Sequence, residues 1–175
     1  TQGKYFEANE IYKKLMKSNY HSLDLISSYA IFNKQLRNNT LAKQLFYFSI
    51  KKFPSFTNSY ILLAEMLRNE NNFDESEKIL LQAKMFEPNN GDIFYNLSLL
   101  YKIQLKNKIA INFVDQAIKL SHENKIYKIL KAELLMDIGL FDLAEIILLN
   151  FTGELKPNIV VQKDILLSKL YKVQR

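Results

Sequence analysis

The chain of 175 residues has no cysteine and no tryptophan, and only two histidines, His21 and His122. Without cysteine it has no disulfide framework and no cysteine–zinc site. Four glycines and three prolines are too few for a barrel, a sandwich or a disordered linker. The isolated glycines cannot form a loop that cradles phosphate. We find no catalytic residues, cofactor site or metal site, and we expect no enzymatic activity from this stretch of chain.

The chain also lacks long apolar runs and a concentrated charge. No run approaches the roughly 18 apolar residues of a membrane span. The 24 basic and 18 acidic residues leave a formal charge of +6, spread along the whole chain, so a nucleic-acid partner is not favoured. No signal peptide is visible, and we expect a cytoplasmic protein. The chain does not begin with Met, so we expect an excised piece of a longer protein. The Asn-, Lys- and Ile-rich composition indicates an AT-rich, bacterial genome.

Residues 57–90 have the pattern of two amphipathic helices joined by a turn. Apolar residues recur at helical spacing on both sides of a polar break at residues 69–72. Small side chains at Ala64 and Ser76 predict that the two helix axes approach closely where they cross. The pattern therefore predicts a helical hairpin about 34 residues long, a length typical of repeat proteins.

Three local signals predict where these helices begin and end. Asp74 and Glu77 have the spacing of a capping box, which predicts Asp74 as the cap of the second helix. Thr40 is the corresponding candidate cap one unit earlier. Pro88 predicts both the end of the unit and the start of the next helix.

The hairpin pattern recurs along the chain. Phe141-Asp142 and the residues after them reproduce Phe73-Asp74 at a spacing of 68 residues, twice 34. In the fourth unit Lys128 interrupts the apolar face of the first helix, as does Lys131. The predicted segments are the second helix of a truncated repeat at 1–22, four repeats at 23–56, 57–90, 91–124 and 125–160, and at 161–175 the first helix of a further repeat or a capping helix.

This pattern resembles the tetratricopeptide repeat family, and the resemblance covers essentially the whole chain. In residues 57–90 the matching places are Tyr60, Leu63, Ala64, Leu67, Phe73, Ser76, Leu80, Ala83 and Pro88. The family's usual glycine is replaced by Ala64. The pentatricopeptide family has a similar period and binds RNA, but the alanines and prolines here are in tetratricopeptide phase. The resemblance implies an all-α, right-handed superhelical solenoid of antiparallel helix hairpins.

The resemblance also implies a concave groove lined by the first helix of each repeat. Outward places early in the chain include Ile31, Lys34, Gln35 and Asn58. The residues that we expect to bind a partner in the groove are Ile61, Glu65, Arg68, Tyr95, Asn96, Leu99, Lys102, Ile129, Glu133 and Met136. The alternative for the apolar members, which include Tyr95 and Leu99, is that they pack between adjacent first helices.

Two known binding modes of the family are not predicted here. The carboxylate clamp for acidic chaperone tails requires Lys, Asn and Arg on successive first helices, and an asparagine ladder requires Asn at one place in every unit. Asn96 has the residue type that each of these modes requires at its place, but the neighbouring repeats do not. The other clamp places hold Ile61, Glu65, Ile126 and Leu130, and the other ladder places hold Ser28, Leu62 and Leu130. A mixed apolar and polar groove is instead typical of binding to an amphipathic helix or an extended peptide.

We therefore predict a protein–protein interaction scaffold that binds a peptide or helix of a partner. The alternative is a substrate-positioning region of a larger enzyme, such as a bacterial glycosyltransferase or sulfotransferase. Open repeats at both ends also make self-association a candidate property.

Overall fold

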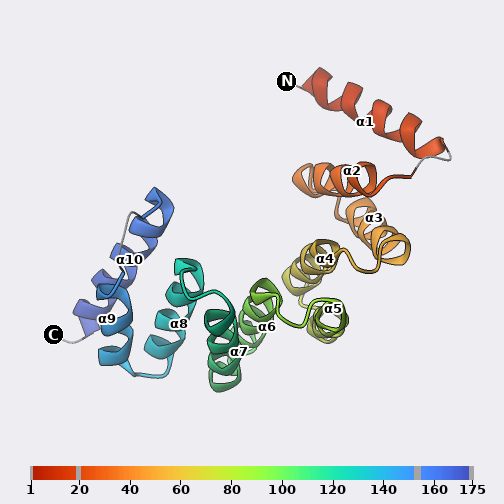
Figure 1. Ribbon diagram of the computed structural model, residues 1–175. Helices are drawn as coiled ribbons and strands as arrows, with labels where there is room; N and C mark the ends of the chain where they lie inside the picture. Colours follow the sequence, from red (N-terminus) through yellow and green to blue (C-terminus); the bar gives the residue numbers. More distant parts are fainter. Residues whose placement is uncertain (1, 19–20, 152–154, 174–175) are drawn as a thin grey trace. The chain divides into compact units, whose positions relative to one another are not determined.

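The computed structural model of the protein describes all residues except 1, 19–20, 152–154 and 174–175 (Figure 1). The described residues form α-helices joined by short turns, and they contain no strand. Contacts between backbone positions divide the chain into two compact units, Thr1–Pro88 and Asn89–Arg175. These are unit 1 and unit 2, respectively.

Each unit contains five described helices. Those of unit 1 are α1 (Gln2–Lys17), α2 (Leu23–Gln35), α3 (Asn39–Lys52), α4 (Thr57–Asn69) and α5 (Phe73–Phe86). Those of unit 2 are α6 (Gly91–Ile103), α7 (Asn107–Leu120), α8 (Lys125–Asp137), α9 (Phe141–Leu149) and α10 (Pro157–Val173).

The helices repeat with a strict period. The first helices α2, α4, α6 and α8 are each 13 residues long, and each begins 34 residues after the one before. The second helices α3, α5, α7 and α9 follow the same period. Three of them have 14 residues, whereas α9 has only 9. The predicted hairpins and their period are confirmed.

The turn inside each hairpin has one left-handed residue at the same place. These residues are Arg37, Asn71, Leu105 and Gly139, with φ angles of 59°, 61°, 59° and 79°. The amide that follows each of them bonds back to a carbonyl five residues earlier, as in the 2.9 Å bond from the Asn72 amide to the Leu67 carbonyl. This is the Schellman arrangement, which satisfies carbonyls that the helix end leaves free.

Small residues lie where the two helices of each hairpin cross, as predicted. Ala64 and Ser76 are fully buried, and Ser76 Oγ donates a 2.8 Å hydrogen bond to the Ala64 carbonyl on the facing helix. In the next hairpin the hydroxyl is on the other helix, because Ser98 Oγ donates to the Ala110 carbonyl at 2.8 Å. The short side chains let the helix axes approach closely enough for a side chain to reach the opposite backbone.

The predicted helix starts are wrong by two or three residues. Helix α5 begins at Phe73 after Asn72, which makes no side-chain capping bond, so Asp74 lies in the first turn and forms no capping box. Helix α3 begins at Asn39, so Thr40 is not its cap. Pro88 precedes α6 by three residues and does not begin it. Because Schellman turns satisfy the preceding helix and lead directly into the next, these second helices begin without a side-chain cap.

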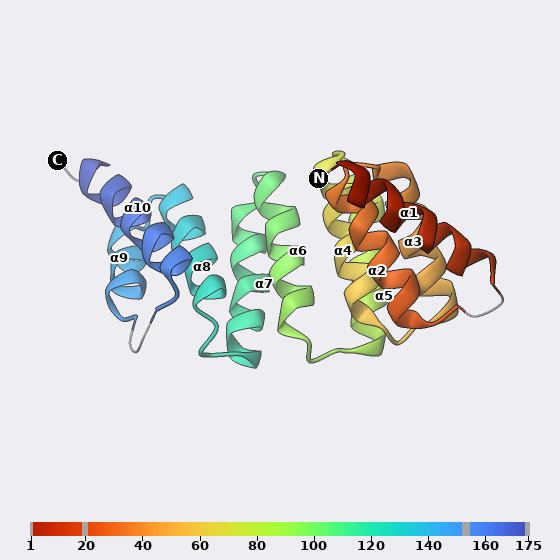
Figure 2. The ribbon, with the colours of Figure 1, turned by 90° about the horizontal axis from the view of Figure 1, so that it is seen from above.

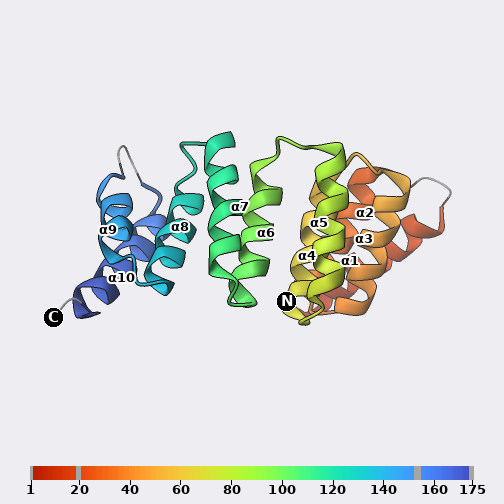
Figure 3. The ribbon, with the colours of Figure 1, turned by 90° about the horizontal axis from the view of Figure 1, so that it is seen from below.

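The buried core of each unit is apolar and lies between its helices. In unit 2 it forms two clusters, one around Val114 and Leu134 and the other around Leu148 and Leu170. Helix α8 lies between α7 and α9 in the three views of the ribbon (Figures 1, 2 and 3). Among the described residues, none of the helices has the length and apolar character needed to cross a membrane.

Candidate functional site

A surface depression lies between the first helices α2 and α4 of unit 1. Its volume is about 420 Å³, and it is lined by Ile31, Lys34, Gln35, Asn58 and Leu62. Helical spacing explains this grouping, because side chains three or four residues apart lie on the same face. The depression thus joins two apolar side chains, two side-chain amides and one lysine.

The lysine of this depression has a carboxylate partner on the neighbouring first helix. Lys34 Nζ is 2.7 Å from Glu65 Oε2, and both side chains are about one-third exposed. Lys102 and Glu133 form the same ion pair between α6 and α8 in unit 2, two repeats later. The pairs compensate the charge of both residues, so these faces present little net charge to a ligand.

The predicted groove residues of unit 2 are tied to their own framework. The Tyr95 ring stacks on the Tyr127 ring with 5.2 Å between centroids. Leu99 is half-buried against the core cluster that contains Val114. Asn96 is only 8% exposed, and its Nδ2 donates a 2.9 Å hydrogen bond to the Asp92 carbonyl within α6. Tyr95 and Leu99 thus keep only part of their surface accessible.

Two further groove residues are buried like Asn96, so the expectation that these three face solvent is wrong. Ile129 is 5% exposed and belongs to the core cluster that includes Ile159 and Leu166 of α10. Arg68 is 8% exposed. Met136 is half-buried against the same cluster as Ile129, and Ile61 is half-buried on α4. Ile129 follows the alternative reading, in which apolar members pack between adjacent first helices.

The predicted binding residues do not include the five that line the depression in unit 1. Four of the five occupy predicted outward places, whereas Leu62 entered the prediction only as a position in an asparagine ladder. The available signal was the i, i+4 spacing of Asn58 and Leu62, which places them on one face of α4. The ten predicted residues do not converge on one described pocket, and their role in binding stays a prediction.

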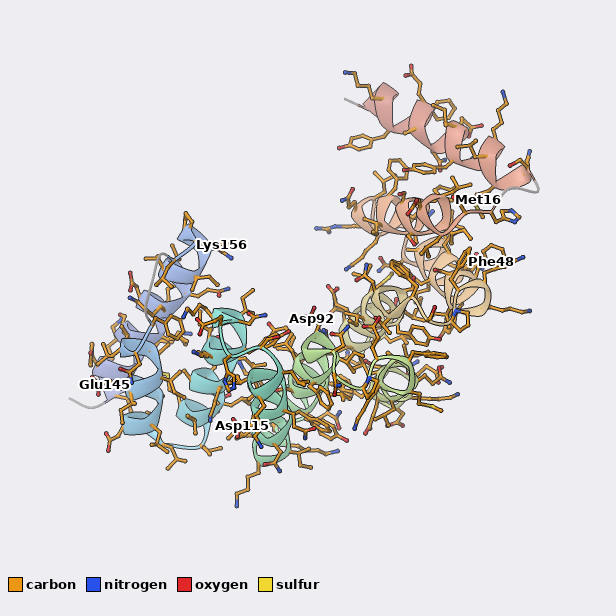
Figure 4. The ribbon with its side chains drawn as sticks, viewed as in Figure 1. Met16, Phe48, Asp92, Asp115, Glu145 and Lys156 are labelled. Atoms are coloured by element: carbon orange, nitrogen blue, oxygen red, sulfur yellow. The ribbon has the colours of Figure 1, made fainter. Side chains whose placement is uncertain are left out.

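Tyr127 and Asp92 form a polar contact between α8 and α6. The Tyr127 hydroxyl donates a 2.6 Å hydrogen bond to Asp92 Oδ1 (Asp92 is labelled in Figure 4). Burial raises the pKa of Tyr127, and this hydrogen bond raises it further. Gly91 makes room for the ring, because a Cβ there would lie 3.1 Å from Tyr127. The contact fixes neighbouring first helices and does not resemble a catalytic pair.

The described residues offer no arrangement of metal ligands. Nowhere in the described ranges do three His, Asp or Glu side chains come close enough to hold an ion. His21 lies between α1 and α2, with its Nε2 3.0 Å from the Met16 carbonyl and its ring edge-on to Phe48. His122 is exposed. These contacts hold the His21 ring between the end of α1 and Phe48 of α3.

Three features together define a tetratricopeptide-repeat fold. They are the 34-residue period, the small residues at the helix crossings and the partly exposed faces of the first helices. No protein-family model matches the sequence, and no curated protein matches it. Solved structures do match.

The chain resembles the thermophilic TPR protein TTC0263 of Thermus thermophilus, with 17% identity, a TM-score of 0.77, and coverage of 95% of this chain and 92% of that one. It resembles a MamA fragment (41-end) from Desulfovibrio magneticus RS-1, with 16% identity, a TM-score of 0.70, and coverage of 83% and 82%. It also resembles YrrB, described as a TPR protein with an unusual peptide-binding site, with 20% identity, a TM-score of 0.62, and coverage of 72% and 65%. At these identities the likeness establishes the fold, and this chain is an all-α protein of helix hairpins with the tetratricopeptide-repeat fold.

Proposed function

We propose that the protein is an interaction module that binds a peptide or helical segment of a partner protein on the outward faces of its first helices. The depression between α2 and α4 carries the proposal, because its lining mixes apolar and amide side chains. Ligand pockets commonly combine an apolar lining with a few polar groups that fix the orientation of the ligand. The described peptide-binding site of YrrB supports the same use of the fold.

The lining of the depression indicates which peptide chemistry it would accept. Ile31 and Leu62 offer apolar surface to a side chain of the ligand. Gln35 and Asn58 carry both donors and acceptors, which suit the N–H and C=O groups of a peptide backbone. Lys34 is already paired with Glu65. We therefore propose a ligand segment that is apolar and low in charge.

Selection from a random library of displayed peptides tests this proposal. We expect the selected peptides to be rich in apolar residues, and Leu62→Ala to weaken their binding by about tenfold or more, because truncation of a residue central to an interface commonly costs this much. Isothermal titration calorimetry measures the dissociation constants. Leu81→Ala is the matched control, since Leu81 is 43% exposed on α5 and does not line the depression.

Equal binding of the selected peptides to the parent protein and to Leu62→Ala would contradict this location. Weaker binding to both alanine variants would point to a general loss of stability, which thermal unfolding of each variant would detect.

The remaining predictions about function rest on the sequence. A catalytic domain in the same reading frame would support the alternative of a substrate-positioning region in a larger enzyme. The partner's identity, self-association and the cytoplasmic location stay predictions.

A further inference from the structure

The fourth repeat contains two lysines at places where the preceding repeats bury apolar side chains. Lys128 corresponds to Tyr60 and Phe94, which are 2% and 4% exposed. Lys131 corresponds to residues 63 and 97, both leucines that are fully buried. The proposed peptide site on α2 and α4 does not use either lysine. The substitution of two core places by cations in one repeat therefore requires a separate explanation.

The two lysines line a cavity within unit 2. It has a volume of about 210 Å³ and lies among α7, α8 and α9, with α8 in the middle of the three (Figures 1 and 3). Its lining consists of Ile118, Lys128, Lys131, Ile146, Ile147 and Asn150. Ile118 packs against one core cluster of the unit and Ile147 against the other, so the cavity lies between the two clusters.

The second helix of this repeat is shorter than that of the second repeat. In the second repeat the Tyr60 ring contacts Phe86, in the last turn of α5, with 6.0 Å between centroids. Helix α5 has 14 residues, whereas α9 has 9 and ends at Leu149. The fourth repeat therefore differs from the second in two ways, in its lysines at these places and in the length of its second helix.

Of the two lysines that line the cavity, Lys131 is ion-paired and Lys128 can bind an anionic ligand. Lys131 Nζ lies 2.7 Å from Asp115 Oδ1 on α7, where Figure 4 labels Asp115. Lys128 is half-buried and has no ion-pair or hydrogen-bond partner among the described residues. Asn150, at the end of α9, adds a side-chain amide. The lining therefore combines a net positive charge, an amide and three isoleucines.

We propose that this cavity binds an aliphatic carboxylate, with the carboxylate at Lys128 and Asn150 and the aliphatic part against the isoleucines. A lysine ammonium binds a carboxylate through a charge-assisted hydrogen bond, which is stronger than one between neutral groups. The apolar wall favours a ligand with a branched or linear alkyl group next to its acid. A peptide that ends in isoleucine and a short fatty acid share this chemistry. The site is independent of the proposed peptide site in unit 1.

Methyl NMR of residues 1–175, labelled at isoleucine δ1 carbons, tests the proposal. The probes are N-acetyl-glycyl-isoleucine as the free acid, the same peptide as its C-terminal amide, sodium octanoate and inorganic phosphate. We expect the free acid, octanoate or both to shift the Ile118, Ile146 and Ile147 methyl signals saturably. The stronger of the two binders identifies the natural source as a peptide terminus or a free acid.

Two variants and a control sharpen the result. Lys128→Gln should weaken binding about tenfold or more, as expected for loss of a charge-assisted hydrogen bond. Lys128→Phe restores the aromatic residue of the preceding repeat and should abolish binding by filling the cavity. Lys119→Gln, an exposed lysine on α7 outside the cavity, should bind like the parent protein.

Three results would each overturn the proposal. The first is an absence of isoleucine shifts with both acids at millimolar concentration. The second is equal binding of the amide and the acid, or of Lys128→Gln and the parent. The third is a phosphate titration that matches the acids, since it would show that the aliphatic group contributes nothing.

Discussion

Leu105 is a leucine in a left-handed turn position. Its φ angle is 59°, and its side chain is 84% exposed. A side chain in this region brings Cβ close to the following carbonyl, whereas glycine has no such conflict. The equivalent place holds Asn71 in the second repeat and Gly139 in the fourth. The third hairpin therefore contains avoidable backbone strain.

Leu105→Gly should raise the free energy of unfolding by about 1 kcal/mol, because it removes this strain and loses little buried surface. Equilibrium denaturation in urea measures the change. Gln104→Gly is the matched control, since Gln104 has a φ of −79° and glycine there should destabilise the protein. A destabilised Leu105→Gly variant would contradict the strain argument.

Tyr127 should make stability depend on alkaline pH. Burial and the bond to Asp92 raise its pKa above the ordinary value of 10.0. The pKa of Tyr127 is higher in the folded protein than in the unfolded chain. The contribution of the protonated Tyr127 to the free energy of unfolding is therefore complete below pH 10 and is lost as the pH rises above it. Urea denaturation between pH 8 and pH 11 should therefore show a steeper fall for the parent protein than for Tyr127→Phe. Parallel curves would show that Tyr127 ionises alike in both states.

At the scale of helices, each hairpin is fixed by the small residues at its crossing. The second hairpin has Ala64 on the first helix and Ser76 on the second, whereas the third has Ser98 and then Ala110. In both, the serine hydroxyl reaches the carbonyl of the alanine at 2.8 Å. The crossing therefore accepts the hydroxyl from either helix.

Ser76→Ala should lower the unfolding free energy by about 1 kcal/mol, the usual net value of one buried hydrogen bond. The double variant Ala64→Ser with Ser76→Ala reproduces the third hairpin and should recover most of that loss. Ala64→Leu should cost about 1–3 kcal/mol, because no space exists for the added atoms. Thermal and urea unfolding measure the stability of all three variants. If the double variant does not recover stability, the serine hydroxyl cannot be supplied from either helix of the crossing.

The helices could be predicted from the sequence more fully than their ends or their exposed faces. Apolar periodicity identified the hairpins, and the small residues at Ala64 and Ser76 located their crossings. The capping pattern at Asp74 misplaces the start of α5, because a Schellman turn leads into this helix without a side-chain cap. The sequence pattern places Ile129 in the groove, because an apolar helical face has the same pattern whether water or another helix such as α10 covers it. Single-helix patterns carry no information about the neighbouring helix.

At the scale of the whole molecule, the same lysine–glutamate pair between first helices occurs twice, two repeats apart. The pairs Lys34–Glu65 and Lys102–Glu133 lie 68 residues apart along the chain. The intermediate place holds Leu99, which cannot form the pair. Many lysines are thus compensated by nearby carboxylates, although the chain has a formal charge of +6.

This compensation predicts weak binding to nucleic acid. A plot of log binding constant against log salt concentration for duplex DNA should have a slope shallower than roughly −2, the value for about two phosphate contacts. Fluorescence anisotropy of a labelled duplex measures it. A steep slope with tight binding at low salt would show instead that the basic residues form a continuous patch.

The proposed function places a bound peptide in the depression between α2 and α4. Intermolecular nuclear Overhauser effects between an unlabelled selected peptide and the methyl groups of the protein test it most directly. We expect such effects from Ile31 and Leu62, and none from Leu81 on α5. Effects from Leu81 without any from Ile31 or Leu62 would contradict the account, because they would place the peptide on the second helices.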